Sequence, residues 1–157
     1  MTSVRLDDPL ALIPNRVRGY QLVNGEVMNS EFIDVSSRFA AGGTRGTVPD
    51  LLRFIKGLES GQLLSTQSLE LMHTPMKTRD GVAIGYSAGW QIPPVKNRGS
   101  LVTNDGGQQE TRTFMLSAPE RRLGLALAMN LEADVYAPIV FRLYEVVVGG
   151  KLEIDRR

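Results

Sequence analysis

The stretch Leu123-Gly124-Leu125-Ala126-Leu127-Ala128-Met129 decides how this chain of 157 residues folds. Large and small side chains alternate along it, which is typical of a β-strand because successive side chains point to opposite faces. Leu and Met share one face, and Gly and Ala share the other. Since neither face is polar, we expect this strand to be covered on both sides, with close packing on the small-residue side.

The residues around this strand predict an antiparallel meander followed by one helix. Further strands are expected at residues 84–92, 100–104 and 111–117. The final helix should start near Asp134 or Pro138 and be capped by Gly149-Gly150. Its apolar period predicts that four residues face the sheet: Ile139, Val140, Leu143 and Val147.

The first half of the chain predicts a hairpin and two helices. Asn24-Gly25 supplies the two positive-φ residues of a type I′ turn between strands at 20–23 and 26–28. Residues 40–43 read as a tight loop. A helix is expected from Thr47, with Asp50 at the capping-box spacing, to Ser60-Gly61. Its apolar face would comprise Leu51, Leu52, Phe54, Ile55 and Leu58.

A second, shorter helix is expected after Ser65 and before Pro75, burying Leu69 and Met72. Helices, then a meander, then one helix make an α+β fold, an antiparallel sheet with helices packed on its faces. No linker or repeat divides the sequence, so a single domain over residues 1–157 is expected.

Composition excludes several kinds of chemistry. The 18 Lys+Arg against 17 Asp+Glu leave no basic excess, which argues against nucleic acid or an anionic membrane as partner. Without Cys there are no disulfides, no thiolate catalysis and no Cys-ligated zinc, and a single His leaves no His-rich metal site. We therefore expect no metal and no cofactor. The sequence has no signal-peptide core and no apolar stretch near the ~20 residues of a membrane span, and the compartment stays open.

Gly85-Tyr86-Ser87-Ala88-Gly89 fits the G-x-S-x-G pattern of a nucleophile elbow. That elbow needs a strand–turn–helix context and a His after the Ser, whereas Trp90 continues the strand and His73 precedes it. We therefore interpret the motif as a Gly-containing strand near a bend. His73 is expected to cap the end of the second helix or lie at the surface. A hydrolase that recruits Ser87 and His73 is the minor alternative.

Thr103 to Gln108 alone predicts a strand end that runs into a polar turn. With its neighbours it resembles the C-terminal part of serine β-lactamase-related hydrolases, which include class C-like enzymes, penicillin-binding esterases and peptidases. The residues that carry the resemblance are 85–90, 104–108, 111–114 and 127–130, with 15–20 and 39–54 upstream. It extends from about Thr2 to Gly149 and covers less than half of a typical member.

The resemblance implies a Ser nucleophile with Lys three residues on, and a Tyr-x-Asn proton relay. Neither pattern occurs in the sequence, so no catalytic residue is expected here, and both motifs would lie upstream of Met1. The third family element, K-T-G or H-x-G on a cleft strand, corresponds to Asn104, Asp105 and Gly106. Gly107 follows at the place whose amide completes the oxyanion hole. Asn104 lacks the charge that would steer a substrate carboxylate, and Asp105 adds a negative charge.

We therefore expect the C-terminal portion of a β-lactamase/transpeptidase-like fold, silent alone toward β-lactams, esters and peptides. Without the family's N-terminal part, a sheet edge and part of the helix face Leu51/Phe54/Leu58 would be uncovered. The alternative is accordingly a non-catalytic binding or assembly module that pairs through an exposed sheet edge. Self-association, or a partner chain that supplies the missing half, is expected in either case. Family members are often exported, which leaves localisation undecided.

Overall fold

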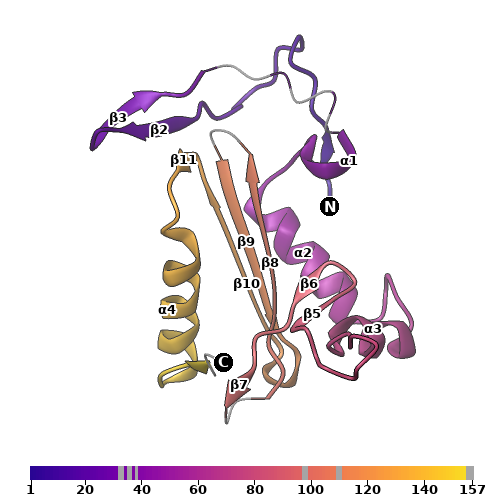
Figure 1. Cartoon of the computed structure of the whole chain (residues 1–157). Helices are drawn as coiled ribbons and strands as arrows, with labels where there is room; N and C mark the ends of the chain where they lie inside the picture. Colours follow the sequence, from indigo (N-terminus) through magenta and orange to yellow (C-terminus); the bar gives the residue numbers. More distant parts are fainter. Residues whose placement is uncertain (32–33, 35–36, 38, 97–98, 109–110, 155–157) are drawn as a thin grey trace.

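The computed structural model describes residues 1–154 except 32–33, 35–36, 38, 97–98 and 109–110. Its centre is a five-stranded antiparallel sheet with strand order β10-β9-β8-β6-β5. The strands are β5 (Tyr86–Ser87), β6 (Trp90–Gln91), β8 (Val102–Gln108), β9 (Thr111–Ala118) and β10 (Leu123–Met129). Helices α2 (Val48–Glu59) and α4 (Tyr136–Val148) lie on opposite sides of it (Figure 1). The expected α+β class is confirmed.

Smaller elements surround this sheet. A three-stranded sheet, in the order β11-β2-β3, lies across one end of the long strands (Figure 1). It is built from β2 (Tyr20–Val23), β3 (Glu26–Asn29) and β11 (Leu131–Glu132). Two short antiparallel pairs join β1 (Arg5–Leu6) to β4 (Thr44–Arg45), and β7 (Val95–Lys96) to β12 (Glu153–Ile154). Further helical elements in the described part of the chain include α1 (Phe39–Gly42), α3 (Thr66–His73) and the 3-10 turn Pro119–Arg121.

Strand β10 is covered on both faces, as its sequence predicts. Leu123, Leu125 and Leu127 pack into the cluster that α4 closes. On the other face, a Cβ on Gly124 would come within 3.1 Å of Ile55 Cγ2 on α2. The alternation of large and small residues therefore separates two layers of packing, one for each helix.

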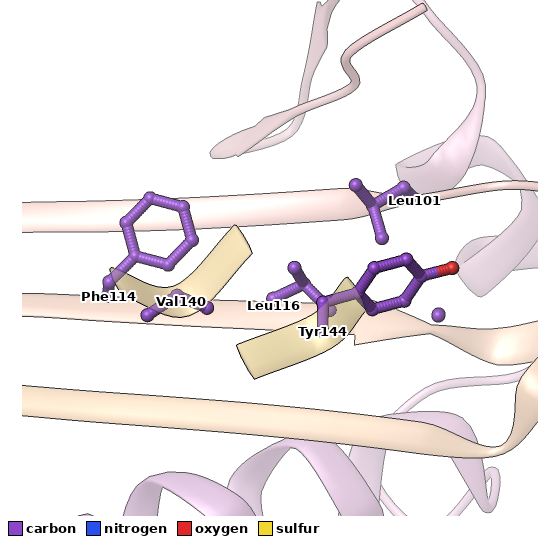
Figure 2. Packing of buried hydrophobic residues seen from close by; sticks show 6 residues of the cluster. Leu101, Phe114, Leu116, Val140 and Tyr144 are labelled. Atoms are coloured by element: carbon purple, nitrogen blue, oxygen red, sulfur yellow. The ribbon is translucent and has the colours of Figure 1, made fainter. Parts of the chain in front are cut away.

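The face that α4 turns toward the sheet differs from the predicted one. Val140 is buried as expected, but Ile139, Leu143 and Val147 are 41%, 48% and 59% exposed. Tyr144 takes the central place at 1% exposure, beside Leu101 and Leu116 (Figure 2). The ring of Phe114 on β9 lies 5.9 Å from that of Tyr136 and 5.6 Å from that of Phe141. α4 has apolar residues on adjoining faces, and these aromatic contacts decide which face is buried.

The first-half predictions are largely confirmed. Strands β2 and β3 pair antiparallel around Asn24 and Gly25, whose φ angles are +53° and +85°. Thr47 is the N-cap residue of α2, and Ser65 caps α3 by accepting a hydrogen bond from the Ser68 amide at 3.2 Å. The buried apolar residues of these helices are Ile55, Leu58 and Met72, whereas Leu69 is half-buried and Leu52 is 40% exposed.

Three local predictions are wrong. Residues 40–43 are no loop, because α1 forms there and the Gly43 amide donates to the Phe39 carbonyl at 3.3 Å. Residues 84–92 form the hairpin β5–β6, in which Ala88 and Gly89 adopt positive φ angles of 42° and 89°. Strand β8 continues through the expected polar turn to Gln108, because β9 pairs with it along that whole stretch.

The packing of α4 gives a direct test. Tyr144→Ala should lower the free energy of unfolding by about 3 kcal/mol, because it leaves a cavity in the main core. The matched control Leu143→Ala removes an exposed neighbour and should cost less than about 0.5 kcal/mol. Urea unfolding of both variants measures the difference. The reverse order would contradict the packing described here and restore the face predicted from the sequence.

Candidate functional site

A cavity of about 540 Å³ lies between β8, the N-terminal half of α2 and the first residues of the chain. Asn104 to Gln108 line it along the strand, and Leu51 and Phe54 line it from the helix. Met1 and Val4 contribute from the N-terminal segment. The stretch that the sequence singles out therefore forms one wall of a cavity. Of the helix face expected to be uncovered, Leu51 and Phe54 are half-buried at the cavity and Leu58 is buried.

The outer edge of β8 opens at this cavity. Among the described strands, β6 pairs with β8 through Thr103 alone, so from Asn104 onward β8 has β9 on one side. The Thr113 hydroxyl lies 3.5 Å from the Gly106 carbonyl oxygen, so this carbonyl points toward β9. In a trans peptide the carbonyl and the following amide point in opposite directions. The Gly107 amide therefore faces the open edge.

Asn104 and Asp105 project to opposite faces of β8, and both are hydrogen-bonded. Asn104 Nδ2 donates to the Gly89 carbonyl at 2.7 Å, which ties β8 to the β5–β6 turn. Asp105 accepts from Gln91 Nε2 at 2.6 Å and from the Tyr136 hydroxyl on α4 at 3.1 Å. Burial, followed by the hydrogen bond to Asp105, raises the pKa of Tyr136. The carboxylate of Asp105 is thus engaged by two donors of the protein itself.

The two glycines of the strand lie close to side chains of β9. A Cβ on Gly106 would come within 2.9 Å of the Thr113 hydroxyl oxygen. A Cβ on Gly107 would come within 3.0 Å of Arg112, whose guanidinium is held 3.3 Å from Glu132. A side chain at Gly106 would require Thr113 to shift, and one at Gly107 would require the flexible Arg112 side chain to move slightly. With glycine at both positions, no side chain of these two residues covers the backbone at this edge.

A second cavity of about 410 Å³ adjoins the first and shares Arg45, Gln108 and Thr111 with it. Asp7 lies here between two arginines, 2.6 Å from Arg16 and 3.4 Å from Arg45. Sequence reasoning missed these residues, because isolated arginines and an aspartate far apart in the chain form no motif.

The side chains that line the two cavities offer no activated nucleophile among the described residues. The hydroxyl groups there belong to Thr44, Thr47, Thr111 and Thr113, and no Ser, Lys, Tyr or His lines either cavity. Within the described part of the chain, no group of three or more His, Cys, Asp or Glu side chains is placed to hold a metal ion.

Ser87 and His73 lie elsewhere and have different partners. Ser87 is 4% exposed and donates to the Leu71 carbonyl at 3.1 Å, in a hairpin instead of a strand–turn–helix elbow. His73 does not lie at the surface: its Nε2 is 3.6 Å from Glu59 Oε1, with 13% of the side chain exposed. Burial lowers the pKa of His73, and the Glu59 charge opposes that shift. Ser117 donates to the same Glu59 oxygen at 2.7 Å.

Asp50 fixes the N-terminal wall of the larger cavity. Its fully buried carboxylate accepts the amides of Thr2 and Ser3, each at 3.0 Å, and the Ser3 hydroxyl. Arg53 donates to it at 2.8 Å. The expected capping box is wrong, because Thr47 makes no side-chain cap bond and Asp50 binds the chain's first residues instead. The segment that carries Met1 and Val4 is thereby held against α2.

Comparison with known proteins identifies the family. The model of the protein family described as Beta-lactamase matches residues 1–147 of this chain. The chain belongs to the Beta-lactamase family. It is 26% identical over 111 residues to penicillin-binding protein 4* of Bacillus subtilis, which covers 70% of this chain and 25% of that protein. The chain thus spans about a quarter of the length of this curated relative.

Solved structures of other proteins share the fold of this chain. The octameric penicillin-binding protein homologue from Pyrococcus abyssi matches with a TM-score of 0.79 at 21% identity, over 96% of this chain and 35% of its own. The D-amino acid amidase from Ochrobactrum anthropi matches with a TM-score of 0.62 at 19% identity, over 95% of this chain and 49% of its own.

Among the described residues, no helix combines the length and apolar character needed to cross a membrane.

The Asp50 contacts predict a pH dependence. The Ser3 hydroxyl, the two amides and Arg53 hold the pKa of Asp50 well below its ordinary value, against an opposing effect of burial. A carboxyl whose pKa is lowered by folding stabilises the protein above its ordinary pKa, and this stability is lost as the pH falls below about 5. Asp50→Asn should therefore lower the unfolding midpoint at pH 7 and flatten its decline in acid. Thermal unfolding between about pH 2 and pH 7 measures this, because the stabilisation is lost progressively from about pH 5 downward, and an unchanged acid slope would contradict the assignment.

Proposed function

We propose that these 157 residues form the C-terminal portion of a serine hydrolase of the β-lactamase type, folded as one domain. They would contribute one wall of the cleft through Asn104, Asp105 and Gly106, and would be catalytically silent alone. By family resemblance the substrate is a β-lactam, an ester or a peptide. The observation that carries this proposal is a bare backbone edge that faces a cavity without an attacking side chain among its described residues.

Gly107 has a defined place in the proposed mechanism. Its amide faces the open edge of β8 without a side chain to block approach, which suits an oxyanion-hole donor. Such a donor acts on the charge that develops in the transition state. The Ser with its Lys partner and the Tyr-x-Asn relay would come from outside these residues, because the sequence contains neither pattern. A partner chain that supplies the missing half would bring both to the cleft.

Assays on the purified chain test this proposal. Nitrocefin and p-nitrophenyl acetate should be hydrolysed no faster than in buffer, and a fluorophosphonate probe should label no residue. Loss of a catalytic nucleophile typically removes roughly a millionfold in rate, so residual turnover would lie below detection. Covalent labelling of Ser87, or of any other hydroxyl of the chain, would overturn the proposal and favour a recruited hydrolase.

A positive control uses the part of the Pyrococcus abyssi homologue that lies outside the matched region, because the match covers 35% of that chain. Co-expressed with this chain, it should restore ester turnover. Gly107→Pro in this chain removes the proposed amide donor and should reduce that turnover by roughly 10²–10³-fold. If turnover is restored but Gly107→Pro does not reduce it, the fragment proposal is supported and the assignment of Gly107 as the amide donor is contradicted.

A non-catalytic assembly module is the second candidate, and strand β10 favours it. β10 ends the five-stranded sheet among the described strands, and its sequence carries neither a charge nor a proline. Such edges invite pairing with another chain, because charge and proline are the usual means of blocking it. The Pyrococcus abyssi homologue is octameric, which supports self-association in this proposal.

Sedimentation distinguishes the surfaces through which copies would pair. The chain should form a concentration-dependent dimer or larger species, and Ala128→Lys, which places a charge on β10, should weaken it. Val147→Lys places the same charge on the exposed side of α4 and serves as the matched control. A strictly monomeric wild type would contradict self-association, and dissociation by Val147→Lys alone would place the contact on α4 instead of β10.

A further inference from the structure

The cleft strand supplies no cation of its own, yet a cation stands at the same cavity. Asn104 occupies the place where the family carries Lys or His, and its amide is engaged by the Gly89 carbonyl. Arg45, on β4, lines both the larger cavity and the adjoining one. A positive charge is therefore present at the cavity, but it comes from a different element.

The guanidinium of Arg45 is only partly satisfied. Its Nε lies 3.4 Å from Asp7 Oδ1, without the geometry of a hydrogen bond. Among the described residues, this buried Nε has no hydrogen-bond partner. Asp7 is shared with Arg16, which holds the other carboxylate oxygen at 2.6 Å. Two arginines against one aspartate leave one positive charge in excess at this place.

The surroundings of Arg45 suit a small organic anion. The two cavities measure about 410 and 540 Å³ and share the Arg45 side, which is within the usual range of small-molecule sites. Thr111 and Gln108 line both cavities beside Arg45 and offer further polar groups. Ala128 and Met129 add apolar surface next to them. A guanidinium fork with free donors binds a carboxylate through two parallel hydrogen bonds, which a neutral amide cannot match.

We propose that Arg45 is the specificity-determining residue of this cleft and binds the carboxylate of a small organic acid or substrate. This inference rests on the proposed function, because it assigns Arg45 the steering role that Asn104 cannot take. Bound there, the carboxylate end of the ligand would place the rest of the molecule in the cavity along Gly106 and Gly107. In this proposal Arg45 on β4 recognises the charge of the ligand, and the backbone of β8 limits the shape of the ligand that fits the cavity.

Direct binding to the isolated chain tests this inference without any turnover. N-acetylphenylalanine is titrated into the ¹⁵N-labelled chain, with N-acetylphenylalaninamide as the neutral analogue of the same shape. The acid should shift the amide signals of Arg45, Gln108 and Thr111, and the neutral amide should bind roughly tenfold more weakly or not at all. Equal binding of the two compounds would overturn the proposal.

Variants assign the effect to Arg45. Arg45→Gln should weaken binding of the acid by roughly tenfold or more and leave binding of the amide unchanged. The matched control is Arg5→Gln, on the paired strand β1, which removes an exposed charge that lines neither cavity. Arg5→Gln should leave both affinities unchanged. An equal loss in the two variants would reduce the effect to net charge and overturn the proposal.

Two further measurements keep the test decisive. If Arg45→Gln fails to fold, Asp7→Asn provides the opposite change: removal of the competing carboxylate should tighten binding of the acid. Inorganic phosphate that binds as tightly as the acid would show a general anion site and contradict carboxylate specificity. Binding of the acid requires no nucleophile. If the acid does not bind, the proposed lack of catalytic activity of the isolated chain is therefore unaffected. Conversely, fluorophosphonate labelling would overturn the proposed function without affecting these affinities.

Discussion

The pairing of β9 with both of its neighbours is the constraint on which the rest of the structure depends. Seven residue pairs join β9 to β10, and seven join it to β8. Phe114 and Leu116 are buried on the face that α4 covers, while Ser117 on the other face meets Glu59 at the end of α2. Because β9 holds β8 straight as far as Gln108, the two glycines remain strand residues and expose their backbone to the cavity.

The sequence predicts those elements whose signals are local. Alternation along Leu123–Met129 indicates both the strand and its cover on two faces, and Asn24-Gly25 indicates the turn of the first hairpin. The signals fail where a distant contact decides. The buried face of α4 depends on the ring of Phe114 on β9, which lies against the rings of Tyr136 and Phe141 on α4. Strand β8 passes through a sequence typical of a turn because the ladder with β9 outweighs the local preference of Asn, Asp and Gly.

The candidate site divides in the same way. Asn104 to Gly107 are found from the sequence because they are contiguous and resemble one family element. The roles of Asp50 and Arg45 come from partners that are remote in the chain: Asp50 binds residues 2 and 3, and Arg45 shares Asp7 with Arg16. Composition counts such charges but does not say which of them meet. Asp50 in particular lies at the spacing of a capping box. Its carboxylate instead accepts hydrogen bonds from the amides of Thr2 and Ser3.

In this cleft the positive charge and the exposed backbone edge come from different elements, Arg45 on β4 and the two glycines on β8. Substitutions can therefore affect the two features separately. A side chain at this edge of β8 requires a shift on β9, because a Cβ on Gly106 would come within 2.9 Å of the Thr113 hydroxyl and a Cβ on Gly107 within 3.0 Å of Arg112. Arg45 lies on the two-residue strand β4, where its half-buried side chain belongs to neither core cluster. A change of residue there alters the electrostatics of the cavity without disturbing the sheet. The recognition of a charged ligand can therefore vary independently of the backbone edge that faces the reacting group.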